Sequence, residues 1–310
     1  MTTTTPAVRD VAQELQFPEG PVARPDGTAL VVEIRRGSLS RVGTDGSVDV
    51  VADLGGGPNG AAIGPDGACY VVNNGGFPWT RVGELTIPLD LETRSNEPPG
   101  FTGGWVERVD LDTGDHTVLY RECDGHAFRS PNDIVFDDTG GFWFTDLGKT
   151  RARDMDKGGL YYGRADGSSV TCAAHGLLGA NGVGLSPAGD RVYVAESFTG
   201  RLWAWDIVAP GKVKGGGGGP GGGHCLVATK GHFDSLAVEE DGTVVVAAIT
   251  DGLCVVRPDF SVEYLALPDA FTTNICFAGD DRRTALVTLS GSGRLVAMDW
   301  PRPGLALAYA

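Results

Sequence analysis

The sequence lacks long hydrophobic runs and closely spaced cysteine pairs. No stretch approaches the roughly 18 apolar residues of a membrane span, and the opening segment MTTTTPAVRD lacks the apolar core of a secretory signal. We therefore expect a cytoplasmic protein that does not bind a membrane. The six cysteines form no C-x-x-C pair, and most lie in apolar, strand-like runs. This favours reduced thiols in the core over disulfides.

Positive charge is also scarce. The chain has 25 Lys and Arg residues against 40 Asp and Glu, a formal net charge of −15, and it has no basic stripe. Such a chain repels a phosphate backbone, so nucleic acid is not an expected partner. The G-x-S-x-G motif of serine hydrolases is absent as well. The most similar segment, SGSG at Ser290, is expected in a turn followed by a strand rather than by the helix that this motif requires. A small molecule remains as the expected ligand.

Glycine and turn-forming pairs, in contrast, are abundant. The 310 residues include 48 Gly, 18 Pro and only 3 Met, together with many Asp-Gly pairs of the kind that close hairpins. This composition is typical of an all-β protein. Because propellers and barrels often reach this length as one unit, we expect a single domain over residues 1–310.

Internal repeats indicate the architecture. Six segments share one order, in which a polar residue opens a short apolar strand, a turn rich in Gly and Asp follows, and a second strand closes the hairpin. A second strand pair follows most of them, as in GSLSRVGTDGSVDVVADL. We therefore predict a six-bladed β-propeller with four-stranded antiparallel blades and a central channel. The segments begin at Phe17, Pro58, Pro131, Ala180, Phe233 and Thr273.

Three segments fall outside the repeat. Residues 1–14 are expected to form an N-terminal extension. An insertion over residues 75–104 separates the second and third strands of blade two, and we expect it to border the channel mouth, where Trp79 and Trp105 would contact the substrate. A packed surface excursion is the alternative. The glycine run over residues 211–223 lacks the order of a phosphate-binding loop and is expected to be a flexible linker on the opposite face.

The polar residues that open the six repeats are expected to meet at the axis, because the first strand of each blade lines the channel. Burying carboxylates and amides without partners costs several kcal/mol, whereas a divalent cation takes their oxygen atoms as ligands. Ca²⁺ or Mg²⁺ suits this set best, and Mn²⁺, Fe²⁺ or Zn²⁺ is also compatible. Turn capping by Asn and Asp is the alternative. We call these six residues the axial ring: Glu19, Asn59, Asn132, Asn181, Asp234 and Asn274.

The same segments resemble a known family. FPEGPV, SPNDIVFDDTGGFWFTD, NGVGLSPAGDRVYVAES and FDSLAVEEDG are similar to motifs of the regucalcin and gluconolactonase family, whose relatives include diisopropylfluorophosphatase-type enzymes. The resemblance extends over nearly the whole chain. It implies a six-bladed propeller with one divalent ion in the channel, usually calcium, and hydrolysis of lactones or, in some relatives, of phosphofluoridates.

The resemblance also implies roles for single residues. It places the metal ligands at Glu19, Asn132, Asn181 and Asp234. It makes Asp133 a residue that supports a ligand or contacts the substrate, and Asn59 and Asn274 are then assigned to substrate or water.

The expected chemistry is ester hydrolysis. The ion would polarise the lactone carbonyl and activate water. Asp234, with Glu19 and Asn132, would be catalytic, and Asp234 acts either as general base or as nucleophile. His126 and His232 approach the ring in sequence, so each is a candidate for substrate contact, with a turn or packing role as the alternative. An isomerase or other non-hydrolytic enzyme and a non-catalytic ligand-binding propeller are competing hypotheses. The sequence leaves the oligomeric state open.

Overall fold

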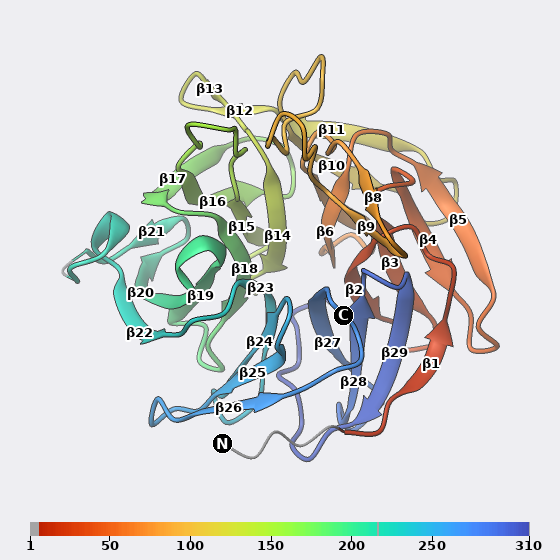
Figure 1. Ribbon diagram of the computed structural model, residues 1–310. Coiled ribbons are helices and arrows are strands. Elements are labelled where there is room, and N and C mark those ends of the chain that lie inside the picture. Colours follow the sequence, from red (N-terminus) through yellow and green to blue (C-terminus); the bar gives the residue numbers. More distant parts are fainter. Residues whose placement is uncertain (1–5, 216, 310) are drawn as a thin grey trace.

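The computed structural model describes residues 6–215 and 217–309. In this part of the chain, six antiparallel sheets are arranged around a central axis, and helix is limited to two single 3-10 turns, η1 (Ser197–Thr199) and η2 (Pro220–Gly222). Figure 1 looks along this axis and shows the blades following one another around it. The predicted six-bladed β-propeller is confirmed.

The first three blades are meanders that run from the axis to the rim in chain order. Blade one contains β2 (Pro18–Ala23), β3 (Ala29–Glu33), β4 (Ser38–Val42) and β5 (Val48–Asp53). Blade two contains β6 (Pro58–Ile63), β7 (Cys69–Asn73), β10 (Trp105–Val109) and β11 (His116–Tyr120). Blade three contains β14 (Pro131–Phe136), β15 (Gly141–Asp146), β16 (Gly158–Arg164) and β17 (Val170–Leu177), and it is preceded by the short hairpin β12 (Glu122–Cys123) and β13 (His126–Ala127).

The remaining blades keep this order except at the end of the chain. Blade four contains β18 (Ala180–Leu185), β19 (Arg191–Glu196), β20 (Arg201–Ala209) and β22 (His224–Ala228), with β21 (Lys212–Val213) also pairing with β20. Blade five contains β23 (Phe233–Val238), β24 (Val244–Ala248), β25 (Gly252–Val256) and β26 (Val262–Leu265). Blade six contains β27 (Thr272–Ala278), β28 (Thr284–Leu289), β29 (Arg294–Asp299) and β1 (Arg9–Ala12).

The N-terminal segment closes the circle of blades. We expected residues 1–14 to be an extension, but β1 pairs with β29 and supplies the outermost strand of blade six. The partners Arg9 and Ala297 lie almost the whole chain apart in sequence. This pairing joins the first and last strands of the chain in one sheet and leaves β29 without an open edge. Four residues carry too little alternation to predict a strand from sequence.

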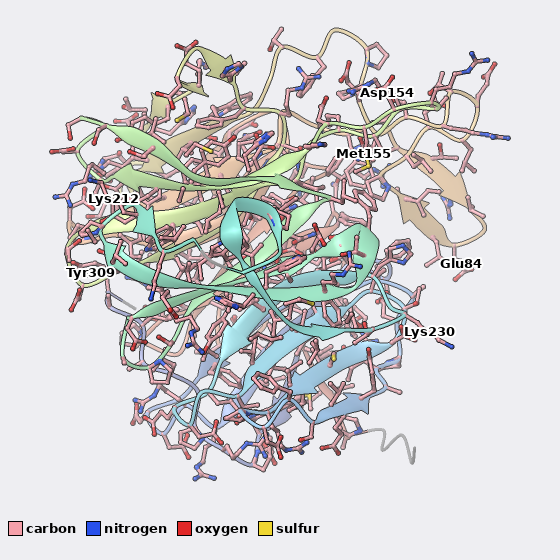
Figure 2. All side chains as sticks on the ribbon, turned by 90° about the vertical axis from the view of Figure 1, so that its left-hand side faces the viewer. Glu84, Asp154, Met155, Lys212, Lys230 and Tyr309 are labelled. Atoms are coloured by element: carbon pink, nitrogen blue, oxygen red, sulfur yellow. The ribbon has the colours of Figure 1, made fainter. Side chains whose placement is uncertain are left out.

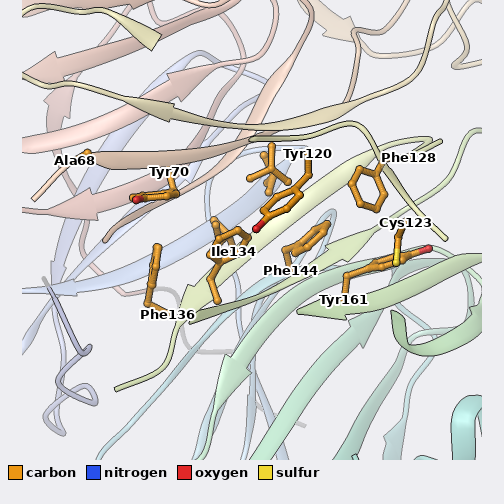
Figure 3. Close-up of a cluster of buried hydrophobic side chains, with 12 residues drawn as sticks. Ala68, Tyr70, Tyr120, Cys123, Phe128, Ile134, Phe136, Phe144 and Tyr161 are labelled. Carbon is orange, nitrogen blue, oxygen red and sulfur yellow. The ribbon is translucent and has the colours of Figure 1, made fainter. Parts of the chain in front are cut away.

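The core lies between neighbouring blades. Figure 3 shows the cluster between blades two and three, where aromatic side chains from both sheets meet. Tyr70 packs edge-on against Phe136 with ring centroids 5.0 Å apart, and Phe144 stacks on Tyr161 at 5.3 Å. Burying an aromatic side chain contributes about 1.5–3 kcal/mol. These layers hold the inner strands at a constant distance from the axis.

The insertion over residues 75–104 lies between β7 and β10, the second and third strands of blade two, and carries the hairpin β8 (Thr80–Val82) and β9 (Leu85–Ile87). Figure 2 shows its turn at Glu84 at one end of the molecule, together with Asp154 and Lys230. Lys212 lies at the opposite end. The insertion and the glycine run therefore lie on opposite faces.

The glycine run is packed rather than a free linker. A Cβ atom at Gly219 would lie 2.2 Å from the Trp203 ring, and one at Gly223 would lie 2.5 Å from the Trp205 ring. Gly219 and Gly223 therefore cover two indoles at the outer part of blade four, and side chains larger than hydrogen do not fit at these two positions. Our expectation of a flexible linker overlooked this packing.

The cysteines are free, as expected, and no disulfide forms among the described residues. Cys69, Cys123 and Cys254 are buried, whereas Cys172 and Cys276 are half-buried. Cys225 is exposed, so the expectation of core thiols was wrong for this residue. A helix with the length and apolarity needed to cross a membrane does not occur within the described ranges.

Candidate active site

The six residues of the axial ring occupy equivalent positions in the innermost strands. Each of its six residues is the second or third residue of the innermost strand of its blade. Each innermost strand contacts that of the next blade, and β27 returns to β2, so the six strands enclose the axis. A constant position in the repeat therefore becomes a constant height on the axis.

A local irregularity accompanies every ring residue. In all six blades the pairing between the first and second strands shifts register at the ring position, as between Glu19 and Val22 in blade one and between Phe233 and Leu236 in blade five. Such bulges break the regular alternation of side chains and re-aim one of them. The sixfold recurrence indicates that the bulge directs these polar side chains toward the axis.

Two glycines allow neighbouring inner strands to approach closely. A Cβ atom at Gly20 would lie 2.9 Å from the Asn59 carbonyl oxygen, and Gly20 also adopts a φ of +50°. A Cβ atom at Gly182 would lie 2.8 Å from the Asp234 carbonyl oxygen. The glycines that follow Glu19 and Asn181 therefore keep the ring narrow.

A second set of polar residues fixes the segments that lead into the ring. Each closes the second strand of a blade, and its side-chain oxygen accepts a backbone N–H one or two residues before the inner strand, at 2.6–2.8 Å. Sequence analysis missed this set, although each residue ends a repeated hairpin, as in LVVE, VVN, FTD and VAE. The four acceptors are Glu33, Asn73, Asp146 and Glu196.

Two ring asparagines bind their neighbours. Asn274 Nδ2 donates to Glu19 Oε2 at 2.6 Å, and Asn274 Oδ1 accepts the Ile275 N–H at 2.7 Å. Asn59 Nδ2 donates to the Asn132 carbonyl oxygen at 2.9 Å. These contacts orient Asn274 and Asn59 within the ring, and both oxygen and nitrogen of Asn274 are already engaged by protein.

Asp133 joins two blades. Its Oδ1 accepts the Ile134 N–H and its Oδ2 accepts the Val183 N–H of blade four, both at 3.0 Å. Burial raises the pKa of Asp133 to about 7, against these stabilising hydrogen bonds. The geometry fits the supporting role that the resemblance implies more closely than direct substrate contact.

Asp234 is the most accessible member of the ring. The other five members are at most 5% exposed, whereas Asp234 is half-buried. Burial raises the pKa of Asp234 to about 8. Burial and, next, the charge of Asp234 raise the pKa of Glu19 well above its usual value. The axis therefore holds carboxyl groups that repel one another when ionised.

The other residues predicted to contact the substrate differ in their distance from the channel mouth. The ring of Trp79 lies 5.1 Å from that of Phe17, which precedes the inner strand of blade one, so Trp79 stands near the channel mouth. Trp105 instead begins the third strand of blade two, away from the axial ring. Its Nε1 donates to Glu107 at 2.8 Å. His126 and His232 are exposed in segments that lead to inner strands.

The sequence also places this propeller among known proteins. Residues 17–291 match the family described as SMP-30/Gluconolactonase/LRE-like region. The chain belongs to this family. Its regucalcin and gluconolactonase resemblance is thereby confirmed.

Two proteins that are similar in sequence to this chain are named as a gluconolactonase and a lactonase. It is 25% identical over 224 residues to the gluconolactonase of Zymomonas mobilis, and this alignment covers 65% of this chain and 55% of that protein. It is 33% identical over 123 residues to lactonase drp35 of Staphylococcus saprophyticus, which covers 39% of this chain and 36% of that protein. The match thus spans about half the length of the first relative and about a third of the second.

Solved structures share the fold of this family member. A gluconolactonase from Xanthomonas campestris matches with a TM-score of 0.73 at 20% identity, covering 95% of this chain and 89% of that one. The calcium-binding protein regucalcin from Agrobacterium tumefaciens matches with a TM-score of 0.72 at 18% identity, covering 99% of this chain and all of that one.

Proposed function

We propose that this member of the SMP-30/gluconolactonase family is a lactonase that hydrolyses a cyclic ester in the propeller channel and binds one divalent cation there, with calcium preferred. The similarity to gluconolactonase and lactonase supports the substrate class. The observation that carries the proposal is the convergence of Glu19 and Asp234 with the amides of Asn132 and Asn181 on one axis.

Among the ring amides, Asn132 is best suited to a cation, whereas Asn181 Nδ2 donates to Ser197 Oγ at 3.1 Å and Asn181 Oδ1 accepts from Ser235 Oγ at 3.5 Å. Asn132 Oδ1 is buried and has no donor within the described part of the chain, whereas the Asn274 side chain already binds protein through both polar atoms. A buried acceptor without a donor is unfavourable and is satisfied by a cation. A cation also relieves the repulsion between Glu19 and Asp234.

No group of three or more His, Cys, Asp and Glu side chains suited to a metal occurs in the ranges that the structure describes. The proposed set contains only two residues of these types, Glu19 and Asp234, and two asparagine amides complete it. All four donors are oxygen atoms, the ligands that calcium prefers. The chemistry of the set therefore favours Ca²⁺ or Mg²⁺ over Zn²⁺.

The half-buried position of Asp234 suits proton transfer to and from a water in the channel. When bound, a divalent cation would polarise the ester carbonyl and stabilise negative charge on its oxygen. Asp234 accepts a proton from the water while the water oxygen bonds to the carbonyl carbon. The bond between that carbon and the ring oxygen of the lactone breaks, and the proton passes to the ring oxygen. The product is an open hydroxy acid.

Asn274 of the axial ring and residues next to the ring orient the reacting groups. Asn274 holds the Glu19 carboxylate, and Asp133 fixes the backbone beside Asn132. Trp79 is the aromatic residue that we propose for contact with an apolar part of the substrate, because it lies beside Phe17 near the mouth. Trp105, on the third strand, is left out of this proposal.

The decisive experiment strips the protein with a chelator and resupplies Ca²⁺, Mg²⁺, Mn²⁺, Fe²⁺ and Zn²⁺ separately. Acid release from a panel of sugar and aromatic lactones is followed by pH-stat, and product masses are recorded. We expect calcium to restore activity and the product to gain one water. Metal binding without turnover would instead support a binding propeller, an unchanged product mass would support an isomerase, and full activity without metal would refute the proposed cofactor.

A further inference from the structure

Lys149 is a fully buried lysine outside the axial ring. It lies three residues beyond β15, on the link between the second and third strands of blade three, and its exposed fraction is 0%. Its Nζ donates to the Gly76 carbonyl oxygen at 2.8 Å and lies 4.0 Å from the centre of the Phe77 ring and 5.0 Å from that of Phe101. All three partners belong to the insertion 75–104, so an ammonium group of blade three is enclosed by a segment of blade two.

The surroundings of this ammonium group show what holds it. An ammonium group without partners is costly to bury, but here one carbonyl oxygen and two aromatic faces surround it. Burial lowers the pKa of Lys149 to about 7, the charges of Asp146, Glu97 and Asp156 oppose that shift, and Arg129 adds to it. The Lys149 amine, with its hydrogen bond to Gly76 and its contacts with Phe77 and Phe101, is therefore a specific attachment point for the insertion.

The far end of the insertion is also attached to blade three. Glu97 pairs with Arg129 at 2.6 Å and with Arg151 at 3.1 Å. The Asn96 N–H donates to the Thr150 carbonyl oxygen at 3.1 Å, and the Thr150 N–H donates to Asn96 Oδ1 at 2.7 Å. Ion pairs and backbone hydrogen bonds at one edge leave little freedom for hinge motion there.

The near end of the insertion connects to the ring by hydrogen bonds. The Gly76 N–H donates to Asn74 Oδ1 at 2.8 Å, and Asn74 Nδ2 donates to Asn59 Oδ1 at 3.0 Å. Because Gly76 also accepts the bond from Lys149, one continuous series of contacts runs from the buried ammonium to the ring amide of Asn59.

The hairpin of the insertion extends across blade one toward blade six. Trp79 packs on Phe17 of blade one, and Leu85 lies beside Gly291 of blade six. A cavity of about 370 Å³ lies between this hairpin and blades one and six, bordered by Phe17, Thr86 and Ser292. Among the described residues, these contacts of the insertion are with blades three, one and six, which leaves blades four and five as the open side of the mouth.

We propose that the insertion 75–104 is a fixed wall of the channel mouth, that Lys149 is the positioning residue that holds it, and that substrate reaches the ring from the side of blades four and five. The proposed entry side of the substrate rests on the proposed lactonase function. The exposure of the axial ring supports entry beside blade five, because Asp234 of blade five is half-buried whereas the other five ring members are at most 5% exposed.

Limited proteolysis of the full chain tests the wall without reference to activity. Arg81 and Arg94 are exposed trypsin sites in the insertion. We expect Lys149→Met to be cut at these two sites at least about tenfold faster than the unmodified protein, because local opening exposes the backbone. Lys157→Met is the matched control, since this exposed lysine lies on the same link, and it should leave the rate unchanged. Equal rates for Lys149→Met and the unmodified protein would overturn the proposal.

A second variant guards against failure of Lys149→Met to fold. Phe77→Leu keeps an apolar side chain but removes the aromatic face nearest the Lys149 amine, and we expect an intermediate rise in cleavage. Cleavage must stay confined to the insertion, because cutting throughout the chain would indicate global unfolding. If Phe77→Leu is cut no faster than the unmodified protein, the attachment by Lys149 is wrong.

Lactone kinetics test the positioning role. We expect Lys149→Met to raise KM about tenfold while kcat changes less than about threefold, because the mouth is altered but the ring carboxylates remain. An unchanged KM together with rapid cleavage would refute the positioning role. If the unmodified protein hydrolyses no lactone, the proposed function fails, while the proteolysis result still decides whether Lys149 holds the wall.

Discussion

Asn274 on blade six donates from Nδ2 to Glu19 Oε2 on blade one across 2.6 Å, although 255 positions separate them in the chain. The same Glu19 oxygen accepts the Gly20 N–H at 2.6 Å. One carboxylate oxygen is thereby fixed by two donors, which leaves the other oriented for a ligand on the axis. The contact also links the first and last inner strands, so the geometry of the site depends on closure of the propeller.

Loss of a ring carboxylate should abolish activity without unfolding the protein. For Glu19→Gln and Asp234→Ala we expect kcat/KM to fall by more than about 100-fold, because each removes one of two negative charges that balance a divalent ion. Metal content and lactone hydrolysis are measured together, and circular dichroism checks the fold. Retention of both stoichiometric metal and full activity by either variant would contradict the assigned ligands.

Asn274→Ala should weaken metal binding while leaving the four ligands in place. Removing the donor to Glu19 Oε2 frees the carboxylate to rotate, and changes to residues that orient ligands typically cost 10–100-fold in metal affinity. Calorimetric titration with Ca²⁺ gives the Kd. Gln13→Ala, at an exposed residue of the rim, is the control. An unchanged Kd for Asn274→Ala would show that Glu19 does not need this support.

The chelated protein should become less stable as the pH rises from 5 to 7. Burial raises the pKa of Asp133 to about 7 and that of Asp234 to about 8. A carboxyl group with a raised folded pKa binds more protons when folded, so its contribution is full below the unfolded pKa of about 4 and is lost as the pH rises through the folded value. We expect Tm to fall by several degrees in this range.

Calcium provides the control for this pH dependence. At pH 7 the added ion should restore more of the Tm than at pH 5, because only ionised carboxylates bind it. A Tm of the chelated protein that rises between pH 5 and pH 7 would contradict the raised pKa values of Asp133 and Asp234.

Gly219→Ala should destabilise blade four, whereas Gly218→Ala should not. A Cβ atom at Gly219 would lie 2.2 Å from Trp203, but a Cβ atom at Gly218 would have no atom within 4 Å. Forcing one extra carbon into a packed site costs about 1–3 kcal/mol. Urea unfolding followed by tryptophan fluorescence compares the two variants. Equal midpoints would show that the run is not packed on the indoles in solution.

A single turnover in H₂¹⁸O tests whether Asp234 acts as the nucleophile. If Asp234 acts as general base, the label enters the product acid and the protein stays unlabelled. If Asp234 attacks the carbonyl, the intermediate is a mixed anhydride, and water that attacks it at the Asp234 carboxyl carbon puts the label into Asp234. Mass spectrometry of the peptide that contains Asp234 gives the answer. We expect the unlabelled peptide, and a labelled one would establish the nucleophile.

The repeat pattern of the sequence by itself determined the fold, the position of the axial ring and the face on which the insertion lies. A polar residue followed by an apolar hairpin recurs six times in the sequence. Because a propeller places equivalent positions at the same height on its axis, the sequence alone predicts that residues such as Glu19 and Asp234 lie close together. The insertion 75–104 could be placed for the same reason, since strand order alone assigns the face on which each link lies.

Only the tertiary structure decided the rest, because those features depend on contacts between segments that no local pattern connects. Pairing of β1 with β29 requires the closed circle, and the hydrogen bond of Asn274 to Glu19 follows from that closure. Lys149 reads in sequence as an ordinary loop lysine, and it becomes buried only because residues 75–104 fold over it from another blade. Periodicity specifies position along a strand, whereas burial and partners are set by what packs against it.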